Sequence, residues 1–116
     1  NHEKALVLST KAEILYHQRN LVKSKQLYEE AISYWSKSED VENEAYTLIG
    51  YSYVFMASDN SDFGLQKAKE AELKFSTLNN SRGIALAQIA IGHIYNTIGE
   101  TQTALHYYLQ AESMFP

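Results

Sequence analysis

Residues 82–116 read RGIALAQIAIGHIYNTIGETQTALHYYLQAESMFP, with apolar residues recurring at intervals of three and four. This spacing places the apolar side chains on one face of an α-helix. The pattern breaks at Gly99, which can adopt the left-handed conformation that ends a helix, and Thr101 can cap the next helix with its hydroxyl. The stretch therefore predicts two amphipathic helices joined by a turn.

The same arrangement occurs twice more when the sequence is shifted by 40 residues, and no gap is needed. Seven columns hold small or large residues in a fixed order: Ala5/Ala45/Ala85, Ala12/Ser52/Gly92, Leu15/Phe55/Tyr95, Ser24/Gly64/Ala104, Tyr28/Ala68/Tyr108, Ala31/Ala71/Ala111 and Trp35/Phe75/Phe115. Such a period is typical of stacked repeats that bury their apolar faces against one another. We expect helices at about 3–18, 21–36, 42–58, 62–78, 82–98 and 101–115, with longer connections around 37–41 and 78–82 between units.

Two of these columns contain small residues and predict where helices approach closely. One is on the first helix of each unit and the other is on the second helix: Ala12/Ser52/Gly92 and Ser24/Gly64/Ala104. Helices reach the short end of the usual range of about 8–10 Å only where no side chain separates their backbones. We therefore expect both columns at helix contacts.

The composition is that of a soluble protein with a substantial core. Hydrophobic residues make up 45% of the 116 residues, which is enough for one domain. The formal charge is -4 and the ten basic residues are scattered, which argues against a nucleic-acid surface and an anionic membrane surface. No stretch approaches the roughly 20 apolar residues of a membrane span, and no signal peptide is visible. We expect a cytoplasmic location.

The third unit resembles a tetratricopeptide repeat almost throughout. The residues that match the family pattern are Gly92, Tyr95, Gly99, Ala104, Tyr108, Ala111 and Pro116, and the other two units match it more loosely. The period of 40 exceeds the ordinary repeat of about 34 residues. Long repeats of this kind are similar to those of kinesin light chains, bacterial Rap-type regulators and bacterial proteins that carry a CHAT peptidase.

The resemblance implies an all-α fold, a right-handed superhelical α-solenoid of three helix-turn-helix units with six antiparallel helices. We expect one domain, 1–116, with repeats at about 1–40, 41–80 and 81–116. Because the chain begins at Asn1 and stops at Pro116, both ends look cut, and we expect it to belong to a larger protein.

The resemblance also implies a concave surface lined by the first helix of each unit, where a partner protein would bind. The matching positions are Glu13, Tyr16, His17, Tyr46, Ile49, Tyr53, Met56, Ile89, His93 and Asn96. This lining has no lysine or arginine, whereas a carboxylate removed from water needs charged donors. We therefore expect an apolar peptide, a helix or a neighbouring domain as partner, in bacterial signalling or regulation, and no acidic chaperone tail.

Patterns that would indicate catalysis are missing. Glu13 and His17 have the spacing of helical metal ligands, but a catalytic zinc site uses three protein ligands. The sequence has no cysteine and no glycine-rich phosphate loop. We expect no enzyme activity, no metal and no cofactor.

Two alternatives to the binding module stay open. Apolar side chains near the end of the third unit have no following helix to cover them, namely Leu105, Tyr108, Leu109 and Phe115. Such a face can bind another copy of the chain. The chain could also be the regulatory segment of a larger enzyme such as a CHAT-type peptidase.

Overall fold

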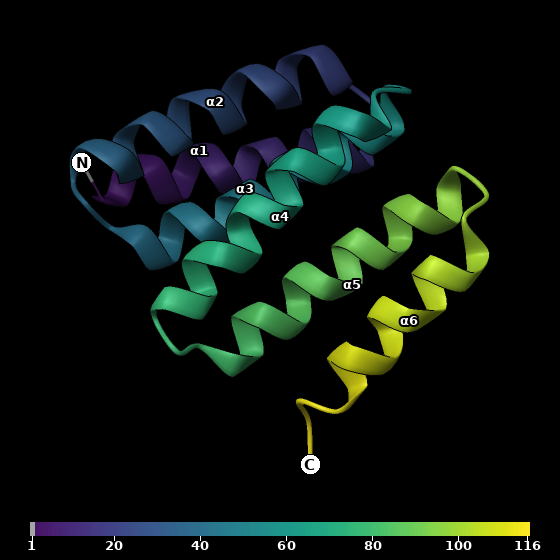
Figure 1. Cartoon of the computed structure of the whole chain (residues 1–116). Coiled ribbons are helices and arrows are strands. Elements are labelled where there is room, and N and C mark those ends of the chain that lie inside the picture. Colours follow the sequence, from purple (N-terminus) through teal and green to yellow (C-terminus); the bar gives the residue numbers. More distant parts are fainter. Residues whose placement is uncertain (1) are drawn as a thin grey trace.

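Six α-helices joined by short turns form the structure, a computed structural model that describes residues 2–116 (Figure 1). The helices are α1 (His2–His17), α2 (Leu21–Lys37), α3 (Val41–Ala57), α4 (Ser61–Thr77), α5 (Ser81–Thr97) and α6 (Thr101–Glu112). No strand occurs between residues 2 and 116. The prediction of six helices in an all-α chain is confirmed, and Asn1 of the first predicted unit lies outside the described residues.

All five turns share one design and recur every 20 residues. Each contains one residue in the left-handed conformation, with φ between 54° and 88°: Arg19, Glu39, Asp59, Asn79 and Gly99. The amide of the following residue donates to a carbonyl five residues earlier, as from Asn20 to Leu15 over 2.9 Å, and this bond closes the end of the helix. The prediction of longer connections between units is wrong, because residues 38–40 and 78–80 form turns as short as the others.

The residue after each left-handed position is the N-cap of the next helix. These N-caps are Asn20, Asp40, Asn60, Asn80 and Glu100. The side chains of Asn20, Asp40 and Asn80 accept a hydrogen bond from the backbone amide three residues on, whereas Asn60 and Glu100 do not. Thr101 was predicted as a cap but is the first residue of α6, so its amide is among those that need an acceptor.

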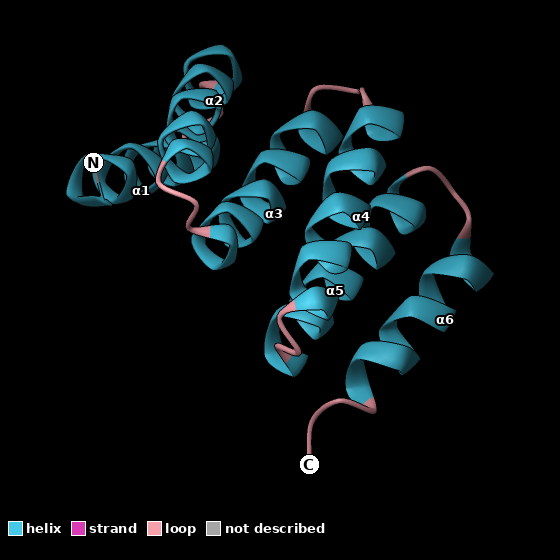
Figure 2. Ribbon diagram, turned by 60° about the vertical axis from the view of Figure 1, so that its left-hand side comes forward, coloured by secondary structure: helices cyan, strands magenta, loops and turns pink. Residues whose placement is uncertain are grey.

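Consecutive helices pack side by side, and the three pairs follow one another from left to right in Figure 2. The odd-numbered helices also meet one another, α1 with α3 and α3 with α5, whereas α2, α4 and α6 make no contact with each other within residues 2–116. The contact between α1 and α3 is much smaller than that between α3 and α5. The architecture is therefore repeat-like, with a row of odd-numbered helices that is loosest beside α1.

The small residues lie at helix contacts, as predicted. The Oγ atom of Ser24 on α2 donates a buried hydrogen bond of 2.7 Å to the carbonyl oxygen of Ala12 on α1. A Cβ atom at Gly64 on α4 would lie 2.9 Å from the carbonyl oxygen of Ser52 on α3. Side chains larger than these would push the paired backbones apart.

The last large column is only partly buried. Trp35 and Phe75 are enclosed in the core, but Phe115 is 42% exposed. The reason is that α6 ends at Glu112 and not at residue 115 as predicted, so Phe115 follows the helix and does not continue its apolar face.

Candidate binding groove

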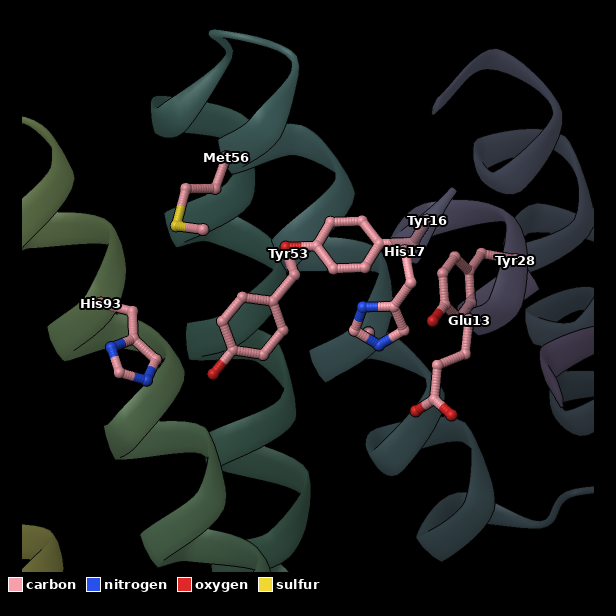
Figure 3. Close-up of a pocket in the computed structure, with 8 residues that line it drawn as sticks. Glu13, Tyr16, His17, Tyr28, Tyr53, Met56 and His93 are labelled. Carbon is pink, nitrogen blue, oxygen red and sulfur yellow. The ribbon is translucent and has the colours of Figure 1, made fainter. Parts of the chain in front are cut away.

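Two adjoining cavities open along the odd-numbered helices. The first has a volume of about 410 Å³, and its lining comes from α1, α2, α3 and α5 (Figure 3): Glu13, Tyr16, His17, Tyr28, Gly50, Tyr53, Met56 and His93. The second has a volume of about 360 Å³ and shares four of these residues, Glu13, Tyr28, Gly50 and Tyr53. We call the two cavities together the aromatic groove.

Tyr28 reaches the base of the groove from α2 because Gly50 on α3 has no side chain. A Cβ atom at Gly50 would lie 2.5 Å from the Tyr28 hydroxyl oxygen. Tyr28 is only 5% exposed, and its hydroxyl makes no hydrogen bond within residues 2–116. Burial, and then the nearby carboxylate of Glu13, raise the pKa of Tyr28 well above its ordinary value. The groove therefore has a neutral, unpaired hydroxyl at its base.

Tyr53 occupies the middle of the groove, between His93 of α5 and the side chains that α1 contributes (Figure 3). The ring centroids of Tyr53 and His93 are 5.9 Å apart. Burial raises the pKa of Tyr53 to about 12, with smaller contributions from Tyr16 and Tyr108. The phenol stays neutral at physiological pH and offers an apolar ring with a polar tip.

His93 is held in place by the last helix. Its Nδ1 atom lies 2.7 Å from the hydroxyl oxygen of Tyr108 on α6, and the two rings meet edge to face at 5.4 Å. Tyr108 in turn fits over Gly92, where a Cβ atom would lie 2.6 Å from Cε1 of the ring. The small residue at position 92 therefore fixes the edge of the groove indirectly, through Tyr108.

Glu13 is the one residue with a formal charge in the lining of the two cavities, which contains no lysine or arginine. Its side chain is exposed and makes no ion pair or hydrogen bond within the described part of the chain. This carboxylate is therefore the source of negative charge in the lining of the groove.

The structure brings together most of the residues that the sequence singled out. Tyr16, His17, Tyr53, Met56, His93 and Glu13 line the first cavity, and Tyr46 and Ile49 line the second. Ile89 and Asn96 line neither cavity, although they share α5 with His93. Binding by any of these residues stays a prediction.

Tyr28 and Gly50 were not among the predicted groove residues. The repeat alignment placed Tyr28 in a column of structural residues, and the sequence does not distinguish a tyrosine in the core from one that faces a cavity. The available signal was Gly50, because a glycine inside a helical pattern often marks a close approach by another group.

The groove contains one acid, two histidines and several phenols, but these side chains do not form a metal centre. No three histidine, aspartate or glutamate side chains converge on one point between residues 2 and 116. None of α1 to α6 combines the length and apolar character that crossing a membrane requires. Comparison with known protein families, curated proteins and solved structures finds no match to this chain.

Proposed function

We propose that this chain is a non-catalytic binding module of the tetratricopeptide type, a right-handed solenoid of three units, that holds a polypeptide segment of a partner protein or neighbouring domain in the aromatic groove. One observation carries the proposal: Tyr16, Tyr28 and Tyr53 line an open cavity of about 410 Å³ whose lining contains no lysine or arginine. Tyrosine is enriched at protein interfaces because its ring buries apolar area while its hydroxyl still finds a partner.

The partial exposure of Tyr16 and Tyr53 favours a binding role for these rings over a purely structural one. A tyrosine ring that only stabilised the fold would be enclosed by its neighbours, whereas Tyr16 and Tyr53 are half-buried and border empty space. Their backbones lie on rigid helices, so little conformational entropy is lost when a ligand binds.

A random peptide library selected on the immobilised chain tests this proposal. Peptides that use the groove will lose about tenfold or more in affinity when Tyr53 is replaced by alanine, the loss typical of an interface hot spot. Tyr107→Ala is the matched control, because Tyr107 stacks on Tyr95 at 5.7 Å and lines neither cavity. If no peptide is recovered, or if both variants bind equally well, the proposal is wrong.

Self-association is a second candidate, favoured by the apolar surface of α6. Leu105 and Leu109 lie one helical turn apart and are 51% and 56% exposed. Sedimentation of the chain at increasing concentration tests it: a dimer should form, and Leu105→Glu with Leu109→Glu should abolish it. The control is the double variant Val22→Glu with Leu73→Glu. These two side chains are more exposed than Leu105 and Leu109 but lie on α2 and α4, so the dimer should persist.

A further inference from the structure

Glu13 and Tyr28 leave the groove with two unused polar functions of different kinds. The Glu13 carboxylate can accept hydrogen bonds and carries a negative charge, and the Tyr28 hydroxyl can donate. Neither group has a partner within residues 2–116. Tyr28 is more than nine-tenths buried, and both residues line both cavities.

The Tyr28 hydroxyl makes no hydrogen bond in the free chain and lines the cavities, so a ligand that supplies an acceptor can form one with it. The carbonyl groups of a polypeptide backbone are such acceptors. The hydroxyl faces the cavity, and Figure 3 shows it beside His17 and Glu13. An occupant that lies along the groove therefore passes Tyr28 and Glu13 together.

The charge of the groove selects the side chain that meets Glu13. A cation there would be attracted by the carboxylate and by the faces of the tyrosine rings, whose π-systems are negative. It would find no lysine or arginine in the lining to repel it. The chain as a whole carries a formal charge of -4, so approach of a basic segment is also favoured at long range.

We propose that the aromatic groove recognises a polypeptide segment with a lysine or arginine side chain, which pairs with Glu13 among Tyr16, Tyr28 and Tyr53 while a backbone carbonyl of the segment accepts from the Tyr28 hydroxyl. This inference rests on the proposed function and names the chemical class of its partner. It also sets the partner apart from an acidic tail, which Glu13 would repel.

The composition of the peptides selected from the random library is the first test. Lysine and arginine should be enriched at one position, and replacing that residue by norleucine should weaken binding about fivefold to tenfold. Glu13→Gln should weaken binding of the original peptide equally and should have no further effect on the norleucine peptide. Glu30→Gln is the control, because Glu30 is an exposed residue of α2 outside both cavities and the substitution changes the net charge by the same amount.

Tyr28→Phe tests the hydroxyl separately, because it keeps the ring over Gly50 and removes only the donor. Binding should fall about fivefold while the melting temperature of the free chain changes little, because the hydroxyl makes no hydrogen bond in the free chain. Tyr51→Phe is the matched control, because the Tyr51 hydroxyl donates to Glu29 over 2.6 Å and Tyr51 lies outside both cavities. Its binding of the peptide should stay unchanged.

The outcomes separate this inference from the function on which it rests. Peptides without enriched cations that still require Tyr53 would overturn the inference and leave the binding groove standing. Equal effects of Glu13→Gln and Glu30→Gln would also overturn it, because they would indicate a general charge effect. Failure to recover any peptide that depends on Tyr53 would overturn both.

Discussion

The Oγ atom of Ser24 donates a hydrogen bond of 2.7 Å to the carbonyl oxygen of Ala12, and both residues are fully buried where α1 meets α2. Ser24→Ala should lower the free energy of unfolding by about 1 kcal/mol, the net worth of one hydrogen bond. The measurement is urea unfolding followed by circular dichroism. Ser33→Ala on the exposed face of α2 controls for the change in helix propensity and should cost nothing. Equal stabilities of the two variants would contradict a role for this bond.

Gly64 has the position equivalent to Ser24 in the next unit, but there the close approach leaves no room for even a methyl group. In an open helix, Gly→Ala stabilises by roughly 0.5–1 kcal/mol. At Gly64 the new Cβ atom would lie 2.9 Å from the Ser52 carbonyl oxygen. This oxygen belongs to the backbone of α3, so it cannot move aside as a flexible side chain could. We expect Gly64→Ala to destabilise the chain by about 1–3 kcal/mol in thermal or urea unfolding.

Gly99→Asn is the contrasting variant for that experiment. A Cβ atom at Gly99 meets nothing within 4 Å, and the equivalent Asn79 already adopts a left-handed conformation with φ of 54°. Asparagine tolerates this conformation, so the cost should stay well below that of Gly64→Ala. Loss of stability at Gly99 alone would mean that the α3–α4 contact is looser than the structure indicates.

Glu100→Asp should stabilise the start of α6. Glu100 is the N-cap of that helix and its side chain accepts no capping hydrogen bond, whereas Asp40 in the same position accepts one of 3.1 Å from the Asn43 amide. Aspartate is a preferred N-cap, so the gain should be about 0.5–1 kcal/mol with no change in net charge. Thermal unfolding measures it, and Glu112→Asp at the other end of α6 should give no gain.

Alkaline pH should destabilise the fold through its buried phenols. The pKa of Tyr53 rises from an ordinary value of 10.0 to about 12 in the folded chain, chiefly because of burial. A raised folded pKa means that the folded state holds its proton more tightly, so the stabilisation is complete below pH 10 and is lost as pH rises through 12. Burial also raises the pKa of Tyr28 and of Tyr51, so the loss continues at higher pH.

Urea unfolding at a series of alkaline pH values measures this effect. Tyr53→Phe has no proton to lose, so its stability should fall less steeply than that of the unaltered chain between pH 10 and 12. Tyr34→Phe is a control, since Tyr34 lies outside both cavities. A Tyr53→Phe curve parallel to that of the unaltered chain would show that Tyr53 is not protected by burial.

The positions of the helices were predictable because the signal is local. Apolar residues at intervals of three and four locate α1 to α6 to within a few residues, and the small columns locate the contacts of Ser24 and Gly64. The turns were predicted less well. Only one of the five left-handed positions carries glycine, so Glu39 gave no sign that its turn matches the turn at Gly99.

The aromatic groove was only partly predictable because it depends on contacts between units. Gly50 accommodates the ring of Tyr28 and Gly83 accommodates the ring of Phe75, yet neither glycine belongs to a repeated column. Which ring covers which glycine depends on how one helix pair is placed against the next, and a helical period contains no information about that placement. Glu13, by contrast, was found from its position on the first helix of its unit.

The small contact between α1 and α3 gives the groove a mechanical property. The first pair is attached to the rest of the chain mainly where α2 meets α3, and we predict that this junction acts as a hinge about which α1 can tilt. A segment that bridges Tyr16 on one side and Tyr53 on the other would brace this hinge. Amide hydrogen exchange in α1 should then slow on binding, so that the stiffness of the first pair reports whether the groove is filled.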